Sequence, residues 1–190
     1  MAIKTFTAGE VLTAADTNTY LANSGLTFIT SGSLSGTAPQ FVGCFTSTYT
    51  NYRVILEQGT LSAAGDFCFQ FLKSTTAQTT TNYQFAYSRL VTSGGSANTA
   101  DTQPVGRWGM GANGTTNLMT MAADVIYPQV AASAAYVIAS GTSLLGGPVY
   151  LSSDGMCVYA VNDSFDGIQF MGSGGQTITG FATIYGYRKA

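Results

Sequence analysis

The residues best suited to chemistry in this chain are three aspartates, Asp154, Asp163 and Asp166, which lie close together in the sequence. Two carboxylates on either side of a glycosidic bond can hydrolyse it, so the group could supply a glycosidase pair. It could also form a loose Ca²⁺ site, although its spacing does not match an EF-hand loop. All three lie in the turn-like segments SSDG and NDSFDG, where aspartate is expected to bond the backbone. We favour the turn interpretation.

Most other catalytic chemistry is excluded by residue type. The chain has no histidine, which removes Ser-His-Asp and Cys-His catalysis and the commonest metal ligand. Cys44, Cys68 and Cys157 lie far apart within apolar segments, so we predict buried, reduced thiols, with one disulfide as the alternative. We therefore expect no cofactor, no metal site and no enzymatic activity.

Arg107 and Trp108 form one further candidate site within the segment GRWGMGANG. An arginine beside the only tryptophan could stack on a sugar ring or contact the surface of a partner. The alternative is that Trp108 is a core residue of a strand whose glycines permit close packing. We keep the pair as a candidate recognition site and favour the core interpretation for Trp108.

Charge is scarce throughout the chain. Charged residues make up 8% of the sequence, against about 25% in an average domain, so we expect a neutral surface rich in hydroxyl groups. Seven Lys and Arg residues and a net charge of -2 cannot provide the basic stripe that nucleic-acid binding needs. The apolar run from Val125 to Ala139 is interrupted by Pro128 and is shorter than the ~18 residues of a spanning helix. We expect neither nucleic-acid binding nor membrane insertion, and the N-terminus lacks the apolar stretch of a secretory signal peptide.

From Leu26 onward, short segments rich in Val, Ile, Tyr, Phe and Thr alternate with Gly, Ser, Asn and Asp, a pattern typical of strands and turns. We predict turns at SSDG, NDSFDG and SGGSANTAD, among others. Phe67, Phe69 and Phe71 share one face of a predicted strand and are the best candidates for the core. The pattern predicts an all-β fold, an antiparallel sandwich or barrel, over residues 26–190.

The first 25 residues differ from the rest. Thr13 and Asp16 are spaced as a helix N-terminal cap, and the residues that follow predict a helix of about two and a half turns that ends between Asn23 and Gly25. A helix shorter than ~12–15 residues is marginal by itself in water. It must therefore pack on its own domain, on a neighbouring subunit or on another protein.

Residues 4–23, KTFTAGEVLTAADTNTYLAN, resemble the segment that begins many tail-fibre and other structural proteins of tailed bacteriophages. That segment has the loose form F-T-A-G-x-V-L-T-A-x-x-x-N-x-Y-L. The segments CFTSTYTNYRVIL (44–56) and FDGIQFMGSGGQTITGFATIYGYRK (165–189) are similar to β-sandwich domains of the same class of proteins. Together the three segments cover about a third of the chain.

The resemblance implies a virion component with a jelly-roll-like β-sandwich, assembled as a homotrimer in the host cytoplasm and attached through residues 1–25. The implied partners are other virion proteins of the tail or capsid, and a host-surface glycan. The attachment residues that it implies are Phe6, Val11, Leu12, Tyr20 and Leu21. We expect a tail appendage, meaning a short tail fibre or receptor-binding subunit, with a capsid decoration or head-fibre protein as the alternative.

Overall fold

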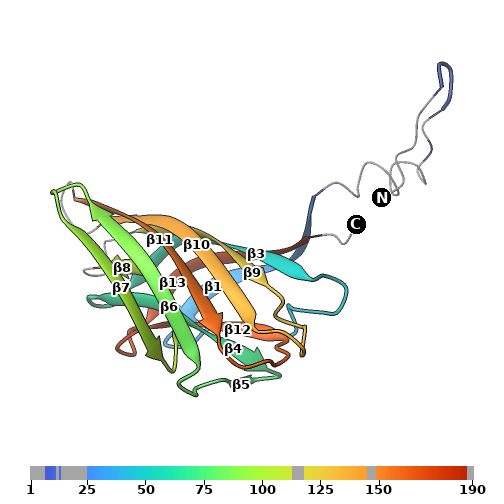
Figure 1. Cartoon of the computed structure of the whole chain (residues 1–190). Coiled ribbons are helices and arrows are strands. Elements are labelled where there is room, and N and C mark those ends of the chain that lie inside the picture. The colour runs from blue at the N-terminus through green and yellow to red at the C-terminus, as the bar shows by residue number, and fades with distance from the viewer. Residues whose placement is uncertain (1–6, 12, 14–24, 113–117, 145–148, 188–190) are drawn as a thin grey trace.

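The computed structural model describes residues 7–11, 13, 25–112, 118–144 and 149–187. These residues form thirteen β-strands in two antiparallel sheets that pack face to face as a sandwich, and they contain no helix (Figure 1). The predicted all-β antiparallel fold is thereby confirmed. The predicted helix of the N-terminal segment lies almost entirely outside the described residues. Residues 7–10 form a turn, in which the Glu10 amide donates to the Thr7 carbonyl over 3.0 Å.

The larger sheet has eight strands, all with antiparallel neighbours. In spatial order they are β1 (Leu26–Gly36), β13 (Ile178–Tyr187), β3 (Asn51–Leu61), β9 (Met119–Ile126), β10 (Ala135–Leu144), β11 (Tyr150–Tyr159), β6 (Tyr83–Val91) and β7 (Ser96–Gln103). The smaller sheet follows the order β2 (Gln40–Phe41), β12 (Gly167–Gly172), β4 (Gly65–Lys73) and β5 (Thr76–Ala77), with β8 (Gly106–Ala112) also paired with β4.

The strand pairs are nested in the sequence. β1 pairs with β13 and β2 with β12, and inside them β3 pairs with β9 and β4 with β8. Four further strands lie between these paired strands in the sequence, and they widen the larger sheet beyond β9. They are β10, β11, β6 and β7. Because β8 also contacts β10, β11 and β6, the smaller sheet covers much of this extension.

The core lies between the sheets and is dominated by aromatic rings. Phe67, Phe69 and Phe71 of β4 are fully buried, which confirms them as core residues. Phe71 stacks on Phe165 with ring centroids 4.7 Å apart, and Phe69 contacts Trp108 with centroids 4.3 Å apart. Such pairs stabilise a fold by about 0.5–1.5 kcal/mol each beyond the area that they bury.

The other side of β4 is buried as well, and its polar groups are paired. Gln40 Nε2 donates to Gln169 Oε1 over 2.7 Å, and Gln169 Nε2 donates to Gln70 Oε1 over 3.1 Å. Gln70 Nε2 then donates to the Pro104 carbonyl over 2.9 Å. This chain of amides joins three strands of the smaller sheet to the connection before β8, so that the buried Gln70 and Gln169 each have partners.

Two predicted turns are wrong. SSDG lies within β11, where Asp154 pairs with Ser140 of β10 and Ser88 of β6, and much of SGGSANTAD forms β7. Strand pairing outweighs the local turn preference of Asp-Gly because β11 has a partner on each side. Gly155 also allows β11 to lie close to β6, since a Cβ at this position would come 2.6 Å from Tyr87 Cβ.

The core assignment predicts a large loss of stability for Phe71→Ala. Because the ring is fully buried and contacts several other rings, its removal should lower the free energy of unfolding by about 3–5 kcal/mol. Urea unfolding followed by circular dichroism measures this change. The matched control is Phe181→Ala, whose ring is 38% exposed and whose removal should cost well under half as much. Equal losses for the two variants would contradict the assignment.

Candidate functional site

The three aspartates do not form one site. Asp154 lies in the middle of β11 and is exposed, whereas Asp163 and Asp166 lie in the connection between β11 and β12. Asp163 accepts the Ser164 amide over 2.8 Å and forms an ion pair with Lys73, while Asp166 accepts the Ser74 amide over 2.8 Å. Asp163 and Asp166 thus accept backbone amides in a connection, as the turn interpretation expects, although the structure assigns no turn to residues 162–166. The interpretation is wrong for Asp154, which lies in a strand. Within the part of the chain that the structure describes, no three His, Cys, Asp or Glu side chains converge as metal ligands.

The cysteines match the prediction of buried, reduced thiols. Cys44, Cys68 and Cys157 are all buried and none is in a disulfide, so the disulfide alternative is not formed. Burial raises the pKa of each thiol to about 12. Because the thiolate is the reactive form of cysteine, the three side chains behave as small apolar residues at neutral pH.

The structure separates the roles of Arg107 and Trp108. Trp108 is 1% exposed and packs between Phe69 and Phe170, so it belongs to the core and offers no ring to a sugar. Arg107 is partly exposed, and its Nη1 lies 2.7 Å from an Asp66 carboxylate oxygen. Arg89 pairs with the other oxygen of Asp66. This group joins β4, β6 and β8 and is a structural cluster.

Of the attachment residues that the resemblance implies, the structure describes one. Val11 is 77% exposed, which leaves its side chain available to a partner. Phe6, Leu12, Tyr20 and Leu21 lie outside the described residues. Their assigned role in attachment therefore stays a prediction.

The larger sheet has a second face, turned away from the core, which we call the outer face. One cross-strand row crosses this face from edge to edge, because each of its residues is the register partner of the next. The row consists of Phe28, Tyr185, Arg53, Asp124, Ile138, Met156, Ala86 and Ala100. It begins with an aromatic pair on β1 and β13, and it ends with small residues on β6 and β7.

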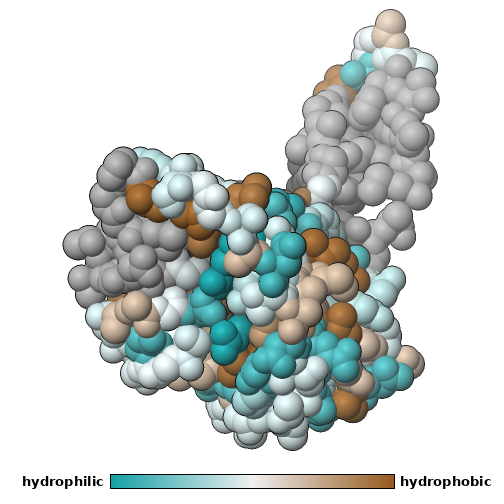
Figure 2. All heavy atoms as spheres, turned by 60° about the vertical axis from the view of Figure 1, so that its left-hand side comes forward, coloured by the Kyte–Doolittle hydropathy of each residue, from teal (hydrophilic) through white to brown (hydrophobic). Residues whose placement is uncertain are grey.

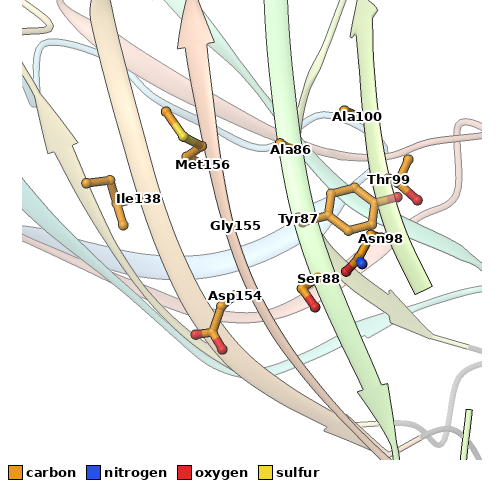
Figure 3. Close-up of a pocket in the computed structure, with 10 residues that line it drawn as sticks. All are labelled: Ala86, Tyr87, Ser88, Asn98, Thr99, Ala100, Ile138, Asp154, Gly155 and Met156. Carbon is orange, nitrogen blue, oxygen red and sulfur yellow. The ribbon is translucent and has the colours of Figure 1, made fainter. Parts of the chain in front are cut away.

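A hollow of about 690 Å³ lies at the small-residue end of this row. Ile138 and Met156 lie on one side of it, and Asn98, Thr99 and Ala100 lie on the other (Figure 3). Ile138 is 54% exposed and Met156 48% exposed, although both are apolar. The side chains of Ala86 and Ala100 are too small to fill the hollow that they line. We call this feature the Ala86 hollow.

Near the centre of the outer face, the charges of Arg53 and Asp124 offset each other. Arg53 Nη1 lies 3.3 Å from Asp124 Oδ1, and the Tyr187 hydroxyl donates to the same oxygen over 2.6 Å. Hydroxyl pairs flank this network, as between Thr120 and Thr142 at 3.2 Å. The space-filling view shows apolar side chains in small separate groups among neutral and hydrophilic ones (Figure 2).

Sequence reasoning did not find the Ala86 hollow. The alternation of side chains along each strand indicates which residues share a face. It does not indicate which residue of the next strand lies beside them. That depends on register, and β6 lies far in the sequence from β10 and β11, beside which it completes the hollow.

Comparisons of this chain with protein-family models, with curated proteins and with solved structures find no match. In the portion of the chain that the structure describes, no helix is long and apolar enough to span a membrane. The interpretation of the site therefore depends on geometry and on the resemblance of the N-terminal segment.

The burial of the three thiols predicts their reactivity. The native protein at pH 8 should react negligibly with a thiol reagent such as DTNB, because a pKa of about 12 keeps the thiols protonated and burial blocks access. In denaturant the same sample should release colour for three thiols per chain. Rapid labelling of the native protein would contradict the assigned burial.

Proposed function

We propose that this protein is a non-enzymatic structural protein of a tailed-bacteriophage virion. Its role is that of a tail appendage, either a short tail fibre or a receptor-binding subunit, docked through residues 1–25. The observation that carries the proposal is the resemblance of residues 4–23 to the opening segment of such proteins. From this resemblance we infer a virion protein that is assembled in the host cytoplasm.

The geometry of the two chain ends supports attachment at one end of the sandwich. Leu26 of β1 pairs with Tyr187 of β13, while Gly36 at the other end of β1 pairs with Ile178. The N-terminal segment therefore joins the sandwich beside the last strand (Figure 1). The connections between β3 and β4 and between β12 and β13 lie at the opposite end, where the Ser62 amide donates to the Thr177 carbonyl over 2.9 Å. A docked protein would present that opposite end to the host surface.

The strand pairing supports the jelly-roll part of the proposal. A jelly roll places eight strands in two facing sheets as two Greek keys. The nested pairs β1 with β13, β2 with β12, β3 with β9 and β4 with β8 alternate between the two sheets, as they would in one long hairpin rolled into a sandwich. In this interpretation β6, β7, β10 and β11 are insertions that widen one sheet.

The charges support a role in protein contacts. All four Lys and Arg side chains of the described sandwich are in ion pairs with Asp124, Asp163 or Asp66. That pairing leaves little positive charge for a phosphate backbone and favours virion proteins or a neutral host-surface glycan as partners. The wide outer face of the larger sheet is compatible with assembly as a homotrimer.

Deletion of residues 1–24 tests the attachment role. The truncated protein should stay folded, because the strands begin at Leu26, and it should be missing from purified particles in a complementation experiment. Immunoblotting of the particles measures incorporation, and circular dichroism checks the fold. Normal incorporation of the truncated protein would refute attachment through this segment.

Single substitutions within the segment sharpen that test. Leu12→Asp and Tyr20→Asp should each reduce incorporation at least tenfold, since both would bury a charge at the docking face. The matched control is Thr37→Asp, which adds the same charge at an exposed bend of the sandwich and should incorporate normally. Equal incorporation of all three variants would contradict the assigned roles of Leu12 and Tyr20.

Imaging of labelled particles separates a tail appendage from the alternative. Label at the tail tip or on fibres would support the tail assignment. Label on the capsid lattice would replace it with a capsid decoration or head-fibre protein, which would use the same attachment segment.

A further inference from the structure

The two ends of the cross-strand row differ in a complementary way. At one end Phe28 is 59% exposed and lies edge-on against Tyr185, with ring centroids 6.1 Å apart. At the other end lies the Ala86 hollow, with Ile138 and Met156 along one side. An apolar ring thus projects from one end of the row, and a hollow beside apolar side chains lies at the other end.

The hollow is large enough to accept such a ring. A cavity of about 150 Å³ can hold benzene, and the hollow measures about 690 Å³. Asp154 lines the hollow but is exposed, so an incoming ring can avoid its carboxylate. Tyr87 is the one aromatic residue in the lining, and its ring is buried, stacked on Phe85 and covered by the Arg89 guanidinium, so it offers no open platform of the kind that sugars stack on. The hollow therefore suits an apolar protein side chain better than a glycan.

Both edges of the larger sheet are open in the described structure. β1 pairs only with β13, and β7 pairs only with β6. Seven of the eight residues of β7 are exposed, so this strand is covered on neither face. Exposed edge strands invite pairing with another chain unless something covers them.

We propose that copies of this chain contact one another head to tail, with Phe28 and Tyr185 of one copy seated in the Ala86 hollow of the next. The two patches are different, so the contact is heterologous, and a heterologous contact forms a ring when its rotation closes. The inference rests on the proposed homotrimer and specifies its contact. In a ring of three, each copy uses both patches once.

The outer face is large enough for one such contact but not for two. Eight strands spaced about 4.8 Å apart and about nine residues long, at about 3.3 Å per residue, make a face of roughly 1,100 Å². A stable interface needs about 800 Å² from each partner. Two contacts per copy would bury more area than the outer face provides, so the exposed sides of β1 and β7 have to take part. The openness of both edge strands meets that requirement.

Crosslinking of the full-length protein tests the contact. We would combine Phe28→Cys with Ala100→Cys and treat the protein with a short bis-maleimide. The native thiols are buried, so only the introduced ones should react. Denaturing gels should show covalent products of two and three chains. A mixture of the two single variants should give two-chain products only, and each single variant alone should give none.

The matched control combines Phe181→Cys with Ala100→Cys. Phe181 is also an exposed phenylalanine of the larger sheet, but it pairs with Ser33 and lies away from the row. This variant should give no crosslinked chains. Crosslinking through Phe181 in place of Phe28 would overturn the proposed contact and indicate a different face.

Light scattering of the full-length protein adds an independent readout. The parent protein should have the mass of three chains. Phe28→Asp and Ala86→Arg should each lower it to that of one chain with an unchanged circular dichroism spectrum, whereas Phe181→Asp should leave it unchanged. A trimer that Phe28→Asp and Ala86→Arg leave intact would overturn this contact alone. A monomeric parent protein would overturn the contact and the homotrimer, while virion attachment is still decided separately by the deletion of residues 1–24.

Discussion

The packing of aromatic rings between the two sheets is the interaction on which the rest of this structure depends. Phe71 of the smaller sheet contacts five other rings, among them Tyr83 and Tyr159 of the larger sheet. The Tyr83 hydroxyl also accepts the Phe71 amide over 2.8 Å and donates to the Gln78 carbonyl over 3.1 Å, so the cluster buries a polar group without leaving it unpaired. Because the rings come from both sheets, their packing holds the larger sheet against the smaller one.

The three arginines of the described sandwich are all paired with aspartates. Asp66 holds two arginines at the junction of β4, β6 and β8, and Arg53 pairs with Asp124 on the outer face. Where the smaller sheet is buried on its second side, glutamine amides provide the hydrogen bonds that charged groups would otherwise make. Such a protein presents hydroxyls, amides and isolated apolar side chains to its partners. Its contacts should therefore depend on shape more than on electrostatic attraction.

The widening of one sheet by β6, β7, β10 and β11 creates the feature that we connect with assembly. Ile138 and Met156 remain exposed on these inserted strands, and β7 has no cover on either side. The N-terminal segment leaves from β1, the opposite edge of the same sheet. Attachment to a particle and contact between copies would then use different parts of the chain, so that the distal connections stay free for a host surface.

The sequence by itself determined the all-β class, the Phe67, Phe69 and Phe71 core face and the burial of the cysteines, because these follow from the local alternation of side chains. The role of residues 1–25 rests on resemblance, and of its assigned attachment residues the structure describes Val11 alone. Tertiary structure decided that Asp154 lies in a strand, that Trp108 is buried and that Phe28 and Ala100 stand at opposite ends of one row. Each of these depends on which distant strands pair and in which register. Register is a property of the assembled sheet, since neighbouring strands such as β11 and β6 are separated by more than fifty residues of chain.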